Sequence, residues 1–352
     1  MHPPNRRSGA DDRFSSSALT GRKKRWPAPL ALAAALLAGA ALAGQNARTV
    51  NPPAAYDTGT VIRTDVRLVV LHTTVADKSG HLVTNLPERA FTVYENGVQQ
   101  QIRSFKREDV PVSMGLIVDN SGSMRYTRAK VEAADMALVT DSNADDEVFI
   151  VNFNDEAFLD LPPGKSFTSD IQEMKDALTR VDSRGGTALF DAIRMSIDHL
   201  KEKAHKDKKV LVVVTDGNDN ASAMTLEGLV RLAQQTEVLI YAVGLLSEEE
   251  RGEAKKAEKA LSALAVATGG EAYFPKDVAE VDRIAHQVAR DIRGQYTIQY
   301  TPSNTLMDGS YRQIKVAVNA PGRPAARTRS GYYATPERAA PAAAASGSSF
   351  KP

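Results

Sequence analysis

Short apolar runs alternate with longer amphipathic stretches between residues 110 and 293. The runs "VSMGLIV", "EVFIVNF", "KVLVVVT", "EVLIYAVG" and "EAYF" contain few polar residues, which is typical of strands buried on both faces. The stretches between them predict helices at 127–141, 169–181, 188–204, 225–236, 249–268 and 278–293. Strands that alternate with helices pair in parallel through crossovers. The pattern therefore predicts an α/β domain at 110–293 with a doubly wound, mostly parallel sheet.

Two stretches beside this domain, residues 56–109 and 294–334, alternate apolar and polar positions with a period of two, which predicts strands. In "FTVYENGVQQQ" the pair Asn96-Gly97 separates two such runs, and this is a strong hairpin signal. About 50 residues of strand bury too little apolar surface to be stable alone. Our hypothesis is that the two β-rich stretches pair with each other in one sandwich-like domain.

The first 43 residues differ in composition from the rest of the chain. "GRKKR" precedes "WPAPLALAAALLAGAALA", an uncharged run that ends on Ala-Leu-Ala, and this order is typical of a secretory signal peptide. We expect residues 1–43 to be removed and the protein to be periplasmic or secreted. The alternative is an uncleaved N-terminal membrane anchor, since the run has 18 residues, near the lower limit for spanning a bilayer. A Pro/Ala linker is expected at 44–55 and a disordered tail at 335–352.

The charge of the chain argues against nucleic acid as a partner, and its cysteine content excludes disulfides as a source of stability. The formal net charge is +1, and residues 1–43 hold seven Lys or Arg against two Asp, so the remaining chain is mildly acidic. A chain without a basic stripe is not expected to bind nucleic acid. It has no cysteine, so no disulfide can stabilise it. No second long apolar run suggests a further membrane contact, so a membrane is a partner only if the N-terminal segment is retained.

Oxygen-bearing side chains lie in three predicted loops of the α/β domain. Asp119, Ser121 and Ser123 come directly after the run "MGLIV", Asp216 follows "VLVVVT", and Thr187 stands after two glycines at the start of a predicted helix. Ligands bind beyond the carboxyl ends of the strands in such sheets, so these loops are expected to converge. Hydroxyls and carboxylates suit Mg²⁺, with Mn²⁺ or Ca²⁺ as alternatives, and the lack of Cys and His in the loops argues against zinc.

These motifs resemble the metal-ion-dependent adhesion site of von Willebrand factor type A domains, which have a Rossmann-like fold. The resemblance covers about residues 110–293, and the whole chain resembles exported bacterial proteins described as acidobacterial-type VWFA-related. It implies Ser121 and Ser123 as direct ligands and Thr187 as a direct or water-mediated ligand. It implies Asp119 and Asp216 as carboxylates that often act through water. It further implies an interaction or adhesion module of the cell envelope, bound to a protein partner that presents an acidic side chain.

Each motif also has a structural interpretation. Asp119, the two serines and Thr187 are residue types that commonly cap turns and helices. Asp219 in "TDGNDN" is interpreted as a solvated loop charge. His199 and His205 are assigned to a solvated helix face.

Catalysis is the main functional alternative. A Mg²⁺-dependent hydrolase or phosphatase could use Asp119 as nucleophile, but Ser121 occupies the position where a second acid is usual. "NSGSM" lacks the G-x-S-x-G elbow, and no P-loop or dinucleotide-binding motif follows a strand. We therefore nominate no catalytic or cofactor-binding residue and expect the protein not to be an enzyme. A structural envelope protein with an unused metal site is the remaining alternative.

Overall fold

The structure is a computed structural model that describes residues 68–336 apart from positions 108, 141, 142, 144, 180–182 and 247–250. All described residues belong to one compact unit that begins at Arg63. The predicted signal peptide, the predicted linker and nearly all of the predicted tail lie outside the described residues.

A six-stranded sheet forms the centre of the α/β domain, in the order β10-β9-β8-β5-β6-β7. Its strands are β5 (Val112–Asp119), β6 (Glu147–Phe153), β7 (Ala157–Leu159), β8 (Lys208–Thr215), β9 (Val238–Gly244) and β10 (Ala272–Tyr273). All neighbours pair in parallel except β7, which is antiparallel to β6. Every residue of β5 is buried, as expected for a central strand covered on both faces. This confirms the predicted doubly wound, mostly parallel fold.

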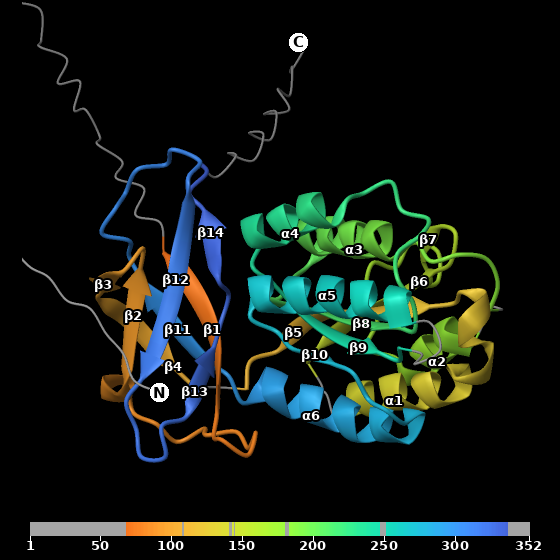
Figure 1. Cartoon of the computed structure of the whole chain (residues 1–352), viewed down its shortest axis with the longest axis horizontal. Helices are drawn as coiled ribbons and strands as arrows, with labels where there is room; N and C mark the ends of the chain where they lie inside the picture. Colours follow the sequence, from red (N-terminus) through yellow and green to blue (C-terminus); the bar gives the residue numbers. More distant parts are fainter. Residues whose placement is uncertain are drawn as a thin grey trace, which may run out of the picture. The chain divides into compact units, whose positions relative to one another are not determined.

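Helices pack on both faces of the sheet (Figure 1). One face carries α1 (Arg128–Thr140), α2 (Ile171–Thr179) and α6 (Val281–Arg293), and the other carries α3 (Leu189–Lys203), α4 (Leu226–Gln235) and α5 (Arg251–Thr268). Side chains of β8 alternate between the two cores: Val210 and Val212 join the first, whereas Leu211 and Val213 join the second, because successive strand residues point to opposite faces. Each α-helix lies within its predicted range.

Two four-stranded sheets are built from the β-rich stretches, in the orders β13-β1-β11-β4 and β14-β12-β2-β3. Their strands are β1 (Val69–Ala76), β2 (Phe91–Glu95), β3 (Val98–Gln100), β4 (Ile102–Lys106), β11 (Tyr296–Tyr300), β12 (Tyr311–Val318), β13 (Ala325–Arg327) and β14 (Gly331–Tyr333). Each sheet joins the two stretches, since β1 pairs with β11 and β2 pairs with β12. Leu71, Val93, Tyr296 and Ile314 share a third apolar core.

Local turns complete these elements. Asn96 (φ 49°) and Gly97 (φ 80°) connect β2 and β3, and the positive φ of both residues matches the twist of a tight hairpin. Short 3-10 helices cover Glu88–Ala90, Gly122–Tyr126 and Val278–Glu280. No helix within the described ranges is both long enough and apolar enough to span a bilayer.

Candidate metal centre

The candidate site lies where the strand order reverses. The chain leaves β5 for β6 on one side, whereas it leaves β8 for β9 on the other. Because β5 and β8 are parallel neighbours, the loops that follow them start side by side and diverge, which is the usual place for a ligand in such a sheet. Asp119 ends β5 and Asp216 follows β8.

Asp119 is fully buried, and hydrogen bonds hold both of its carboxylate oxygens. Oδ1 accepts from the Ser121 N–H (2.8 Å), and Oδ2 accepts from the Thr215 hydroxyl (2.5 Å). Burial raises the pKa of the Asp119 carboxyl, while the hydrogen bonds from Thr215 and Ser121 act in the opposite direction. Both donors are uncharged, so they do not neutralise the ionised Asp119 carboxylate, and a nearby cation would stabilise it. Thr215 is a residue that the sequence analysis missed, although it directly precedes Asp216.

Three side-chain oxygens from the loops after β5 and β8 lie close together. The Ser121 and Ser123 hydroxyl oxygens are 3.0 Å apart, and the Ser123 hydroxyl donates to Asp216 Oδ1 over 2.8 Å. In an octahedral shell with bonds of about 2.1 Å, neighbouring oxygens are about 3.0 Å apart. The spacing of the two serine hydroxyls therefore fits two neighbouring ligands of a Mg²⁺ ion, and Asp216 contacts this pair through its hydrogen bond from Ser123.

Thr187 reaches the same region from the loop before α3. Its side chain is 4% exposed, its N–H donates to Asn220 Oδ1 (2.9 Å), and its carbonyl accepts from the Asn220 N–H (3.1 Å). A Cβ on Gly217 would lie 3.6 Å from the Thr187 hydroxyl. The structure thus brings all five predicted ligand residues to one edge of the sheet, with Asn220 as a partner that sequence reasoning missed.

The two glycines before Thr187 are required by close contacts. Gly185 has φ +77°, and a Cβ there would collide with the Asp155 carboxylate. Asp155 Oδ1 also accepts from the Gly186 N–H (2.7 Å), and a Cβ on Gly186 would approach Asn220 Oδ1 to 2.8 Å. The loop therefore packs against Asp155 and Asn220 at distances that a larger residue would prevent.

Two expectations from the sequence are wrong. Asp219 is not a solvated charge, because its Oδ1 accepts from the Phe190 N–H (3.2 Å) and from the Ser222 hydroxyl (2.5 Å). The bond from Phe190 caps the first turn of α3. His199 is half-buried, its ring lies 4.5 Å from that of Phe149, and Nε2 bonds to the Ser166 carbonyl (2.8 Å). Both residues are anchored by tertiary contacts that a helical charge pattern does not reveal.

The chemistry of the site rests on hydroxyls. Among the described residues, no group of three or more His, Cys, Asp and Glu side chains could hold a metal ion. A zinc site of the usual kind is therefore not formed by this part of the chain. Two serines, one threonine and two carboxylates are hard donors, which favour Mg²⁺, Mn²⁺ or Ca²⁺.

In a comparison with known proteins, residues 114–218 match a family described as the von Willebrand factor type A domain. An uncharacterized protein of Borreliella burgdorferi is 26% identical over 181 residues, which cover 49% of this chain and 50% of that protein. The chain thus spans about half the length of this curated relative.

Solved structures similar to this chain include a von Willebrand factor type A protein from Catenulispora acidiphila, with 16% identity, a TM-score of 0.43 and coverage of 74% of this chain and 71% of that chain. An aerotolerance-related membrane protein from Bacteroides fragilis has 17% identity, a TM-score of 0.42 and coverage of 51% and 98%. The vWF domain of a type V pili tip protein from Porphyromonas gingivalis has 12% identity, a TM-score of 0.41 and coverage of 52% and 97%.

Proposed function

We propose that the protein is a metal-dependent interaction module of the cell envelope, starting from the match of residues 114–218 to the von Willebrand factor type A domain family. The observation that carries the proposal is the pair of Ser121 and Ser123 hydroxyl oxygens, which lie 3.0 Å apart, together with the Ser123 hydroxyl's hydrogen bond to Asp216 Oδ1 over 2.8 Å. In this proposal the module recognises an acidic side chain of a protein partner.

The ligand residues have different tasks in this proposal. Ser121 and Ser123 would hold Mg²⁺ directly, Thr187 would bind it directly or through water, and Asp119 and Asp216 would act mainly through water. The bound ion would supply a Lewis acid to which a partner's carboxylate could bind. Neutral hydroxyls leave most of the positive charge on the ion. Because both ligands share one centre, partner affinity and metal affinity should raise each other.

Exposed side chains close to the proposed ligands favour a protein partner with acidic groups. Tyr126 is 93% exposed and lies in the 3-10 turn Gly122–Tyr126, which also contains Ser123. Arg184 beside Gly185 is also exposed. Exposed Tyr and Arg side chains are the residue types that contribute most to protein interfaces, and the Arg184 guanidinium group is complementary to an acidic surface.

The geometry disfavours catalysis by Asp119. A nucleophilic carboxylate needs an oxygen that can reach its substrate, whereas Asp119 is fully buried and both oxygens accept hydrogen bonds. A Mg²⁺-dependent phosphatase activity towards p-nitrophenyl phosphate that disappears in Asp119→Asn would contradict the proposed interaction role.

The first test uses Ser123→Ala, with Ser169→Ala as the matched control, because both serines are exposed and only Ser123 contributes to the site. Millimolar Mg²⁺ should raise the thermal midpoint of the wild type and of Ser169→Ala, because an ion that binds only the folded state stabilises it. Ser123→Ala should unfold in EDTA within about 1 kcal/mol of the wild type and lose the Mg²⁺ effect. A wild type with the same midpoint in Mg²⁺ and EDTA would count against the proposal.

The second test addresses the partner. Wild-type protein should retain an envelope protein in Mg²⁺ and release it in EDTA, while Ser123→Ala should retain none. Excess of a short Asp-containing peptide should displace the partner, because the peptide carboxylate competes for the same coordination position. Retention that is equal in EDTA would contradict a metal-dependent contact.

A further inference from the structure

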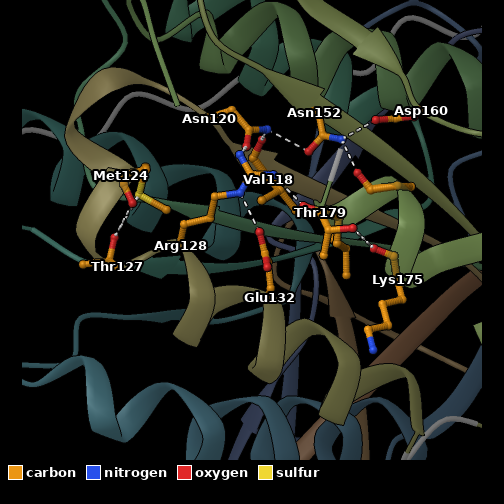
Figure 2. Close-up of polar contacts among 12 residues, drawn as sticks. Val118, Asn120, Met124, Thr127, Arg128, Glu132, Asn152, Asp160, Lys175 and Thr179 are labelled. Atoms are coloured by element: carbon orange, nitrogen blue, oxygen red, sulfur yellow. Dashed lines mark hydrogen bonds and ion pairs between the residues drawn. The ribbon is translucent and has the colours of Figure 1, made fainter. Parts of the chain in front are cut away.

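Asn120 lies between Asp119 and Ser121 in the sequence and is fully buried. Its side-chain amide donates to the Val118 carbonyl (3.2 Å) and to Asn152 Oδ1 (2.7 Å), and its Oδ1 accepts from Arg128 Nη1 (Figure 2). Its backbone N–H donates to the Phe153 carbonyl (2.7 Å). The backbone that presents Asp119 and Ser121 is therefore held from below by directional bonds.

Arg128 is the first residue of α1 and connects three elements with one guanidinium group. Nη1 donates to Asn120, Nη2 donates to the Leu178 carbonyl in the last turn of α2, and Nε donates to Glu132 Oε1 (2.5 Å). The Arg128 side chain is 12% exposed. A planar group with donors in fixed directions is suited to such a fixed junction.

Asn152 extends the network into the sheet and α2. Its Nδ2 donates to Asp160 Oδ2 (2.9 Å) and to the Ala177 carbonyl (3.0 Å), while its Oδ1 accepts from Asn120 (Figure 2). Asn152 is 0% exposed and Asp160 is 6% exposed. Buried polar groups that are all hydrogen-bonded rigidify their surroundings.

The loop that carries Thr187 depends on the same residue. The Asn120 carbonyl accepts from the Arg184 N–H (2.9 Å), and the Gly122 N–H donates to the Gly185 carbonyl (3.2 Å). A displacement of Asn120 would therefore move both loops that supply hydroxyl ligands. No atom of Arg128 needs to touch the ion for this effect.

We propose that Arg128, acting through Asn120, is a positioning residue that sets the cation affinity of the site. This inference rests on the proposed function, because it assigns a role towards the ion held by that site. Partners that orient metal ligands typically change metal affinity by about 10- to 100-fold when they are removed.

The direction in which cation affinity changes when Arg128 is replaced distinguishes a positioning role from a purely electrostatic one. Removing a positive charge close to a cation site should strengthen cation binding by Coulomb's law. Loss of the junction at Arg128 should instead weaken it. Arg125 offers the matched control, because it lies in the adjacent 3-10 turn, is exposed, and forms no ion pair among the residues that the structure describes.

The experiment measures Mg²⁺ binding to the full chain by titration calorimetry for wild type, Arg128→Met, Arg128→Lys and Arg125→Met. Arg128→Met should bind Mg²⁺ about 10- to 100-fold more weakly, whereas Arg125→Met should bind as tightly as the wild type or more tightly. Arg128→Lys should also lose affinity, because one ammonium cannot replace three diverging donors. Electron paramagnetic resonance of bound Mn²⁺ should show an altered coordination symmetry in the Arg128 variants only.

The outcomes separate this inference from the function on which it rests. The positioning role alone would be overturned if the wild type binds Mg²⁺ and the Arg128 variants bind it equally tightly or more tightly. Wild type that binds neither Mg²⁺ nor Mn²⁺ would overturn the proposed function and this inference with it. Circular dichroism in EDTA checks folding, and if Arg128→Met is unfolded, Arg128→Lys decides.

Discussion

At the scale of single residues, the carboxyl group of Asp135 is buried in α1 without a complete set of partners. The side chain is 3% exposed, and Oδ2 has no hydrogen bond. Burial, with a smaller contribution from Glu132, raises the pKa of Asp135 to about 8. The protonated form is therefore the one that the folded protein favours at neutral pH.

Asp135 makes the stability of the metal-free protein depend on pH. The folded pKa lies above the unfolded one, so the folded state keeps a proton that the unfolded state releases. The stabilisation is present below about pH 4 and is lost as pH rises through about 8, with a slope of up to about 1.4 kcal/mol per pH unit. Urea unfolding in EDTA from pH 5 to 8 measures it. Asp135→Asn should flatten the curve, and parallel curves for the two proteins would contradict the assignment.

At the scale of elements, the candidate site consists of loops that rigid strands and helices bring together. The first loop follows β5 and runs directly into the 3-10 turn Gly122–Tyr126 and α1. The loop with Thr187 is fixed against Asp155 and Asn220. Because these loops pack on one another, the backbone conformation of one is expected to influence ligands on the other.

Gly185→Ala should therefore damage both stability and metal binding. The substitution adds a Cβ at φ +77° and against the Asp155 carboxylate. Gly164→Ala is the control, since Gly164 has φ +84° but nothing within 4 Å of an added Cβ. We expect a loss of about 1 kcal/mol for Gly164→Ala and about 2–4 kcal/mol for Gly185→Ala. Urea unfolding and Mg²⁺ titration check this, and equal losses would mean that the contact with Asp155 is unimportant.

At the scale of the whole molecule, an ion-pair cluster links the β-rich part to the α/β domain within the unit that begins at Arg63. Arg327 of β13 lies 2.8 Å from Asp291 Oδ2 of α6 and also pairs with Glu271. Asp291 is 2% exposed. Burial raises the pKa of Asp291, and the charge of Arg327 counteracts this shift.

Arg327→Met should destabilise the protein by about 3–5 kcal/mol, because it leaves a buried carboxylate without its partner. The double variant Arg327→Met/Asp291→Asn should recover part of this loss, since the charge that lacks a partner is removed as well. The control is Arg283→Met, whose pair with Glu280 lies on the surface of α6 and should contribute no more than about 1 kcal/mol. Urea unfolding measures the free energy of unfolding of each variant. Equal losses in Arg327→Met and Arg283→Met would contradict the prediction.

The position at which the mature protein begins is a separate prediction at this scale. If residues 1–43 are a signal peptide, the mature protein begins near Gly44. Intact mass spectrometry of protein from the envelope or the medium measures this directly. Retention of all 43 residues would support the alternative of an N-terminal membrane anchor.

The sequence by itself determined the fold class and the order of elements in the α/β domain. Uninterrupted, short, β-branched runs such as "VLVVV" are typical of strands covered on both faces, and the six α-helices lie where their amphipathic stretches predicted them. The short strand β7 was missed because three residues carry no periodic signal. The candidate ligands were identifiable because their spacing after two strands is a local property of the chain.

Only the tertiary structure decided which groups support those ligands. Thr215, Asn120 and Arg128 gain their roles from partners 8 to 96 positions away. Asp219 and His199 were misjudged for the same reason, since a polar residue on an exposed-looking stretch can find a partner from another element. Spacing along the chain predicts residue type and local conformation, but hydrogen bonds between distant segments form only once the sheet has brought the loop ends together.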